Sequence, residues 1–191
     1  GSSRASSTTE ERRQITVIFC EMDGLGDMSS SLDAEDLLEL GEQYRSIWQG
    51  QIERFGGTTG VYIDGALYGY FGYPIAHEHD ARRALLCGLA IQSEVDTLVN
   101  KAGQTGITRP SVRVGINTGF AIVAQQNGVT QVHGNTGAMA ARLAELSAGG
   151  SVVASGATMR VVGPGFDYKS LGNQRIRGFT DPVPLYEVVA E

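Results

Sequence analysis

A strand pattern that leads into a long amphipathic helix pattern constrains this chain to a mixed fold. The strand is predicted at Ile15–Cys20, where β-branched and aromatic residues follow one another without interruption. The next segment repeats apolar side chains every three or four residues, as one face of a helix does. These side chains are Leu37, Leu40, Tyr44, Ile47, Trp48, Ile52 and Phe55. Asp33 is suited to cap the start of this helix, and Gly56-Gly57 is suited to end it.

A hairpin and a second amphipathic helix follow. Thr58–Ile63 and Ala66–Phe71 are strand patterns, and they flank Asp64-Gly65, a pair that favours a tight antiparallel turn. A second helical pattern begins near Asp80 and extends to Leu98. These segments extend the predicted order of elements to strand, helix, strand, strand and helix.

The remaining segments complete one α+β domain. In order, they are a loop at Gly103–Pro110, a strand at Val112–Ile116, a turn at Asn117–Gly119, a strand at Phe120–Ala124, a helix at Thr136–Leu146, a strand at Ser151–Ala154, a short helix at Ser155–Val162 and two strands that end at Leu185–Val189. The order up to residue 117 is that of a ferredoxin-like βαββαβ core. We therefore predict an α+β fold in which this core is followed by extra C-terminal strands and helices.

The first dozen residues differ in composition from the rest of the chain. They are small, polar and rich in Ser and Thr, which indicates a linker or tail over residues 1–12. We predict one folded domain over residues 13–191, cut from a longer protein whose other domains would be its partners.

Composition excludes several classes of protein. The formal net charge of −6 argues against nucleic acid or an anionic membrane as the main partner. The 26 glycines follow no period of three and alternate with apolar segments, which excludes collagen and low-complexity disorder. No transmembrane run or signal peptide is visible. Cys20 and Cys87 lie in apolar segments, so we predict two buried free thiols and a reducing, cytoplasmic compartment.

The acidic segment after the first strand is one candidate for chemistry. Glu21–Asp27 contains three carboxylates, and Asp64 at the hairpin could bring a fourth toward a divalent metal ion. Backbone N–H groups at Gly24, Leu25 and Gly26 could approach a phosphate. Acidic residues and glycines are also common in turns that bind nothing, and the spacing alone favours this simpler interpretation.

Two further positions invite a functional interpretation. His77-Glu78-His79-Asp80 has a His-x-His spacing, but Asp80 as a helix cap and two solvated histidines explain it without a metal. Arg142 lies in an otherwise apolar, small-residue helix, where a guanidinium requires an anion. That anion is either a phosphate or a carboxylate such as Glu145, and both remain open.

Several ordered blocks together resemble the catalytic domain of the class III adenylyl and guanylyl cyclases. The resemblance extends from Arg13 to Val189. It is carried by Thr16–Leu25, Glu53–Gly72, Pro74–Ala84, Val112–Gly119, Gly134–Leu143 and Gly178–Val188. The resemblance implies the cyclase fold, with a site at a dimer interface where two Mg²⁺ or Mn²⁺ ions held by two aspartates activate the ribose 3′-hydroxyl against the α-phosphate of a nucleoside triphosphate.

The resemblance assigns the two metal positions to residues that differ from the family pattern. The first aspartate falls at Glu21, which keeps a carboxylate but is one methylene longer. The second falls at Gly65, which has no side chain, and the preceding Asp64 is a possible substitute. Because neighbouring residues of a strand point to opposite faces, Asp64 is expected to point away from the metal site.

The positions that the family uses to bind the base and the transition state are also altered. The base-reading lysine falls at Val61 and its partner aspartate at Gln131, while the transition-state asparagine falls at Ala138. Only the transition-state arginine is retained, as Arg142. Losses of this kind together amount to about 10 kcal/mol, or about seven decades in rate.

These departures lead to one main functional hypothesis and two alternatives. The main hypothesis is a degenerate cyclase homology domain, catalytically impaired, that acts as a regulatory, dimerisation or nucleotide-binding module in signalling and binds Mg²⁺ or Mn²⁺ with ATP or GTP weakly or not at all. One alternative is an active nucleotidyl cyclase with nonstandard metal ligands and altered base selectivity. The other is a heterodimer in which this domain acts on an active partner; the main hypothesis also admits a homodimer.

Overall fold

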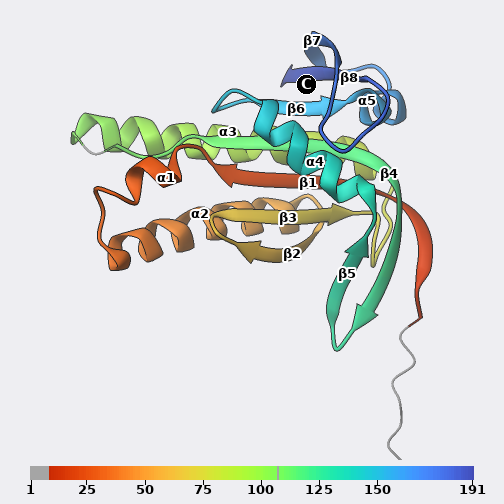
Figure 1. Ribbon diagram of the computed structural model, residues 1–191, viewed down its shortest axis with the longest axis horizontal. Helices are drawn as coiled ribbons and strands as arrows, with labels where there is room; N and C mark the ends of the chain where they lie inside the picture. Colours follow the sequence, from red (N-terminus) through yellow and green to blue (C-terminus); the bar gives the residue numbers. More distant parts are fainter. Residues whose placement is uncertain (1–8, 107) are drawn as a thin grey trace, which may run out of the picture.

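The computed structural model describes residues 9–106 and 108–191 of the chain. The strands are β1 (Glu11–Met22), β2 (Thr58–Ile63), β3 (Ala66–Phe71), β4 (Val112–Gln126), β5 (Val129–His133), β6 (Val152–Ser155), β7 (Asp167–Gln174) and β8 (Val183–Ala190). The helices are α1 (Leu25–Met28), α2 (Ala34–Arg54), α3 (Asp80–Gln104), α4 (Asn135–Leu146) and α5 (Gly156–Val162). The strands form one sheet in the order β2-β3-β1-β4-β6-β8-β7, and β5 pairs with β4 outside this path (Figure 1).

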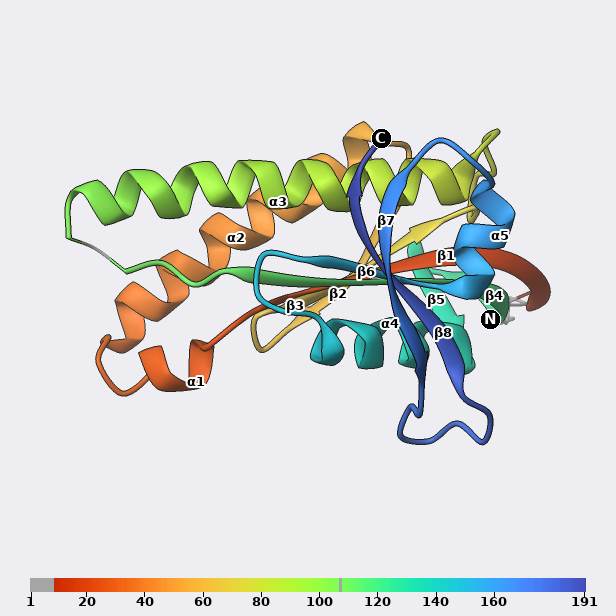
Figure 2. The ribbon, with the colours of Figure 1, turned by 90° about the horizontal axis from the view of Figure 1, so that it is seen from above.

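The two faces of the sheet are covered by different helices. Figure 2 shows α2 and α3 along one face and α4 on the other. The alternation of side chains along β1 serves both layers: Ile18 and Cys20 pack in the core under α2 and α3, whereas Val17 and Phe19 pack in the core that includes Ala140 of α4. The predicted α+β fold, with a ferredoxin-like core and extra C-terminal elements, is therefore confirmed.

Local signals in the sequence set the ends of several elements. Asp33 caps α2, since its Oδ1 accepts a hydrogen bond of 2.9 Å from the backbone N–H of Asp36. The β2–β3 turn contains Asp64 at φ 50° and Gly65 at φ 77°, the left-handed backbone that this pair favours. Cys20 and Cys87, the two cysteines of the chain, are both buried and free, as predicted.

The prediction of a turn at Asn117–Gly119 with a separate strand at Phe120–Ala124 is wrong. Both segments belong to the single 15-residue strand β4. The reason is the length of β1, which pairs with β4 along all twelve of its residues, from Glu11 opposite Val123 to Met22 opposite Val112. This continuous partner holds residues 117–119 in extended backbone although their types are common in turns.

The remaining differences from the prediction include two element boundaries and one strand that was not predicted. Strand β1 begins at Glu11, two residues before the expected start of the domain. Helix α3 extends to Gln104 and so includes the first two residues of the expected loop at Gly103–Pro110. Strand β5 had not been predicted, although Asn127-Gly128, with φ values of 52° and 75°, is the hairpin signal that precedes it.

No helix among residues 9–106 and 108–191 has the length and apolar character needed to cross a membrane.

A glycine on β4 brings α4 unusually close to the sheet. A Cβ atom added at Gly115 would lie 2.1 Å from the carbonyl oxygen of Ala140 and 2.5 Å from the backbone nitrogen of Ala144. Both neighbours are backbone atoms of α4, so they cannot rotate away as a flexible side chain could. The absence of a side chain at Gly115 is therefore what permits this helix to pack on the strand.

We expect Gly115→Ala to destabilise the fold by about 3 kcal/mol, because the added methyl group forces α4 away from β4. Chemical denaturation followed by circular dichroism measures the change. Gly103→Ala is the matched control, since Gly103 is helical, exposed and has no atom of the described residues within 4 Å of its added Cβ. The control should be neutral or slightly stabilising; a comparable loss in both variants would contradict the role assigned to Gly115.

Candidate functional site

Glu21 stands near the end of β1, on the side of the sheet that α4 covers. It lies opposite Ala66 of β3 and Arg113 of β4. Burial raises the pKa of its carboxyl group above the ordinary value, and the charges of Glu145 and Asp23 raise it further, while the Arg113 guanidinium lowers it. The structure thus gathers three carboxylates and one guanidinium around the position that the resemblance assigns to the first metal ligand.

Arg113 is the cation of this cluster. Its Nη2 lies 2.8 Å from Oδ1 of Asp23, so one of the carboxylates predicted as a metal ligand is instead engaged in an ion pair. Sequence reasoning did not single out Arg113, because its place beside Asp23 and Glu21 depends on the pairing of β1 with β4. An arginine opposite a strand-end carboxylate is the signal that would have indicated it.

Gly65 is buried in the β2–β3 turn, and the space beside it is filled. A Cβ atom added there would lie 2.7 Å from Cδ2 of Leu25 and 3.1 Å from Cε of Met22. Asp64, the possible substitute ligand, is exposed on the same turn. The turn therefore offers no carboxylate at position 65, and a side chain there would require Leu25 to shift.

The residues present do not fit a pair of divalent cations. Among residues 9–106 and 108–191, no three His, Cys, Asp or Glu side chains are grouped in a way that could hold a metal ion. Of the nearby carboxylates, Asp23 pairs with Arg113, Glu145 pairs with Arg142, and Asp64 is exposed on the turn, which leaves Glu21 as the candidate ligand of this cluster. Mg²⁺ is usually bound through one or two carboxylates together with substrate phosphates, so Glu21 alone could hold at most one ion with a nucleotide and provides no site for a pair.

Helix α4 contributes the retained arginine. Nη1 of Arg142 lies 2.9 Å from Oε1 of Glu145, so of the two anions left open by the sequence the structure shows the carboxylate. Burial raises the pKa of the Tyr68 phenol, and the charge of Arg142 lowers it, which shows that Arg142 lies near Tyr68 of β3. Ala138 is exposed in the first turns of α4, directly after Gly137, whose added Cβ would lie 3.7 Å from Cε1 of Tyr68.

Aromatic side chains that the sequence analysis missed form the floor under α4. The rings of Phe19 and Tyr68 meet edge to face with centroids 4.8 Å apart, and those of Tyr68 and Tyr70 are stacked at 6.4 Å. The alternation of Tyr68 and Tyr70 in β3 was the available signal. These rings form a largely apolar surface beneath α4.

The two positions that the resemblance assigns to base reading lie on two different strands. Val61 is exposed on β2, and Gln131 lies on β5, where its Nε2 donates a 2.8 Å hydrogen bond to Gln126. Strands β2 and β5 contact each other, so the two positions assigned to base reading lie on neighbouring edge strands. The structure does not group them with Glu21.

The segment predicted as a phosphate approach forms a short helical turn. Gly24 has a left-handed backbone at φ 77° and precedes α1, which contains Leu25 and Gly26. Leu25 turns its side chain toward Gly65, as the 2.7 Å approach shows. This segment therefore packs against the β2–β3 turn.

The His77–Asp80 segment starts α3, and the prediction of Asp80 as its cap needs correction. His79 is the N-cap residue, with φ 61°, and Asp80 is the first residue of the helix. The side chain of Asp80 bonds backward, since its Oδ2 accepts a 2.9 Å hydrogen bond from the backbone N–H of His77.

Comparison with known proteins identifies the family of this chain. The family described as "Adenylate and Guanylate cyclase catalytic domain" matches residues 7–189. Adenylate cyclase 1 of Rhizobium meliloti is 23% identical over 184 residues, which cover 93% of this chain and 28% of that protein. The chain thus spans less than a third of the length of this relative.

Solved structures show the same architecture. The adenylyl cyclase CyaB of P. aeruginosa superposes with a TM-score of 0.89 and 26% identity, covering 96% of this chain and 97% of that one. The guanylate cyclase domain of RhGC from Catenaria anguillulae, solved with GTP, superposes with a TM-score of 0.84 and 21% identity, covering 96% of this chain and 99% of that one, a likeness of fold. With the family pattern extending over nearly all of its residues, this chain belongs to the adenylate and guanylate cyclase catalytic-domain family.

Proposed function

We propose that this chain is a catalytically impaired member of the cyclase family that serves as a regulatory or dimerisation module in a longer signalling protein. The observation that carries the proposal is the β2–β3 turn. Gly65 supplies no ligand at the position that the resemblance assigns to the second metal aspartate, and Leu25 would have to shift before a larger side chain could stand there.

The remaining site supports the same function. At the first metal position, the Arg113 guanidinium pairs with Asp23 and offsets only part of the cost of burying the Glu21 charge, so the pKa of Glu21 stays raised. Arg142 is engaged with Glu145 on its own helix. A triphosphate would have to compete with Glu145 for Arg142, and it would meet the carboxylates without the cations that normally separate them.

A dimer with a second cyclase-type domain is part of the proposal. Apolar side chains are exposed on the edge strands β2 and β5 and on the inner strand β4: Val61 on β2, Phe120 on β4 and Val129 on β5 are each 55% exposed. Exposed apolar side chains on and beside edge strands favour a protein partner. The module would then act through packing against a homologous domain, either a second copy or an active cyclase.

An active cyclase with rearranged metal ligands is the alternative. It requires Glu21, Asp23 and Asp64 to converge on cations, which the ion pair of Asp23 and the exposure of Asp64 disfavour.

We expect the purified domain to form no cyclic nucleotide from ATP, GTP, CTP or UTP with Mg²⁺ or Mn²⁺, because no second metal ligand is present. Product detection by mass spectrometry is the measurement. An intact cyclase domain, assayed alone and mixed with this one, is the positive control. Cyclic product formed by this domain alone would overturn the proposal.

We expect Gly65→Asp to destabilise the domain by about 2 kcal/mol more than Gly24→Asp does. The two glycines share a φ of 77°, but only Gly65 has a neighbour inside contact distance, so the comparison isolates the clash with Leu25. Thermal unfolding measures both variants. Adding Leu25→Ala should recover part of the loss at Gly65→Asp, and equal destabilisation of the two single variants would contradict the assigned packing.

We expect Glu21→Gln to stabilise the domain at neutral pH. Because the pKa of Glu21 is raised in the folded state, its ionised form disfavours folding above that pKa, and this penalty disappears as the pH falls below the ordinary pKa of a glutamate. Chemical denaturation at a series of pH values should show the stabilisation at neutral pH and its loss in acid. Glu10→Gln, at an exposed position, is the control; a less stable Glu21→Gln variant at neutral pH would show that the charge favours folding.

A further inference from the structure

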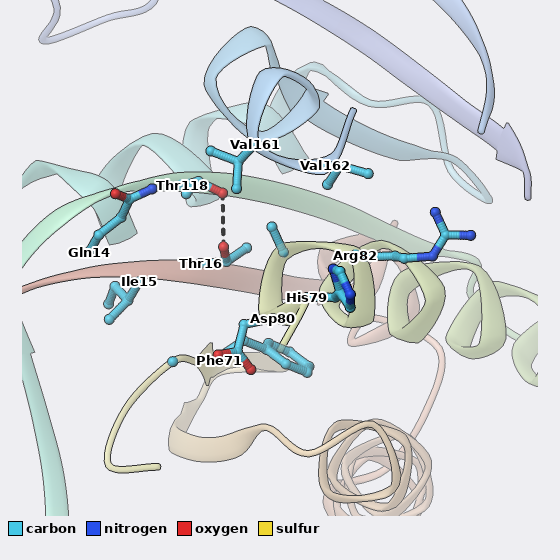
Figure 3. Close-up of a pocket in the computed structure, with 12 residues that line it drawn as sticks. Gln14, Ile15, Thr16, Phe71, His79, Asp80, Arg82, Thr118, Val161 and Val162 are labelled. Atoms are coloured by element: carbon cyan, nitrogen blue, oxygen red, sulfur yellow. Dashed lines mark hydrogen bonds between the residues drawn. The ribbon is translucent and has the colours of Figure 1, made fainter. Parts of the chain in front are cut away.

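A cavity separate from the candidate site lies on the other side of β1. It has a volume of about 280 Å³ and is lined by β1, the first turn of α3, β4 and α5 (Figure 3). Ile15, Phe71, Val161 and Val162 give it apolar walls. This volume is at the lower end of the range for small-molecule sites, so it suits a ligand with a short hydrocarbon body.

A line of buried polar side chains begins in the wall of this cavity. Oγ1 of Thr16 lies 2.9 Å from Oγ1 of Thr118, which lies 3.0 Å from Oγ1 of Thr158. The line continues to Ser155 at 3.2 Å and from there to Oδ1 of Asn117 at 2.7 Å. All five residues are at least nine-tenths buried, so their hydrogen bonds are not replaced by bulk water.

The direction of every hydrogen bond in this line is fixed from one end. Asn117 donates through Nδ2 to the carbonyl oxygen of Thr136, so its Oδ1 is the acceptor for the Ser155 hydroxyl. The single proton of Ser155 is then used, and Thr158 must donate to Ser155. By the same count, Thr118 donates to Thr158.

The assignment of donors and acceptors along this line ends at Thr16, in the wall of the cavity. Thr16 must donate its proton to Thr118, because the Thr118 proton is already used. The oxygen of Thr16 can therefore only accept a further hydrogen bond. The residue Thr16 is 2% exposed and lines the cavity.

Asp80 adds a second acceptor to the same cavity. Its Oδ2 accepts from the backbone of His77, but its Oδ1 is buried without a hydrogen-bond partner among the described residues. Nδ1 of His77, which carries a charge only when the imidazole is protonated, lies 3.8 Å from that oxygen, beyond hydrogen-bond distance. A buried carboxylate oxygen left in this way favours a donor, above all a cationic one.

The arginine of the cavity wall does not satisfy Asp80. Arg82 pairs with Glu191 and lies over the ring of Phe166 at 4.9 Å. Figure 3 shows its guanidinium directed away from Asp80 and from the Thr16–Thr118 pair. Since Arg82 and Glu191 compensate each other, Asp80 is the carboxylate of the lining that lacks an ion-pair partner within hydrogen-bond distance among the described residues.

We propose that this cavity binds a small ligand that carries a protonated primary amine on a short alkyl chain. The ammonium group donates to Oγ1 of Thr16 and to Oδ1 of Asp80, whose side chain must turn to present this buried atom to the cavity, and the chain packs against Phe71 and the two valines of α5. The site uses none of the residues assigned to the cyclase site, so it stands whether or not the proposed function does.

The test is a titration of the ¹⁵N-labelled chain with n-butylammonium chloride, followed by amide chemical shifts. We expect saturable shifts at residues that line the cavity, and at least tenfold weaker binding of n-butanol and of butyrate, which lack the cationic donor. Asp80→Asn, which keeps an acceptor for His77, should weaken butylammonium binding about tenfold or more.

Val161→Trp provides a second variant that does not disturb the buried acceptors. Val161 is 55% exposed at the cavity, so a larger side chain can fill the opening without entering the core. This variant should also lose the shifts. The proposal is overturned if butylammonium produces no saturable shift at the cavity, if butanol binds equally well, or if both folded variants bind as the unchanged chain does.

Discussion

The bare backbone contact between Gly115 and α4 sets the geometry of one whole face of this domain. Because Ala140 and Ala144 approach the strand without an intervening side chain, α4 is held against β1 and β4 at a short distance. The volume left beneath the helix is small, and Tyr68 and its aromatic neighbours fill it. Glu21 is consequently half-buried among fixed charges, and its pKa reflects that confinement.

Much of the fold could be predicted from the sequence because local signals and tertiary packing agree. The apolar stripe of α2 and the Asp64-Gly65 turn each specify one structure in isolation, and the sheet uses both as predicted. The failure at Asn117–Gly119 has the opposite cause. Those residues favour a turn locally, but the twelve-residue partner strand β1 and the buried hydrogen bonds of Asn117 and Thr118 keep them extended.

The sequence shows which family residues are missing from the candidate site, but it does not show which side chains lie in their place. That position 65 carries glycine, and position 138 alanine, can be read directly from the chain once the family pattern is aligned. That Leu25 occupies the space beside Gly65, and that Arg113 stands beside Glu21, depends on where α1 folds back and on strand register. Such contacts join residues far apart in sequence, so no local sequence pattern predicts them.

The polar line from Thr16 to Asn117 has a consequence for how this interior can change over time. In this line, which joins Thr16, Thr118, Thr158, Ser155 and Asn117, each of the three inner hydroxyls donates one hydrogen bond and accepts another, so replacing any one of the three leaves a buried neighbour unsatisfied on each side. Single substitutions there are costly, whereas coordinated replacement of several members by apolar residues is not. The five positions should therefore be inherited together or lost together, and they would mark related domains that share this interior even where every residue of the nucleotide site has diverged.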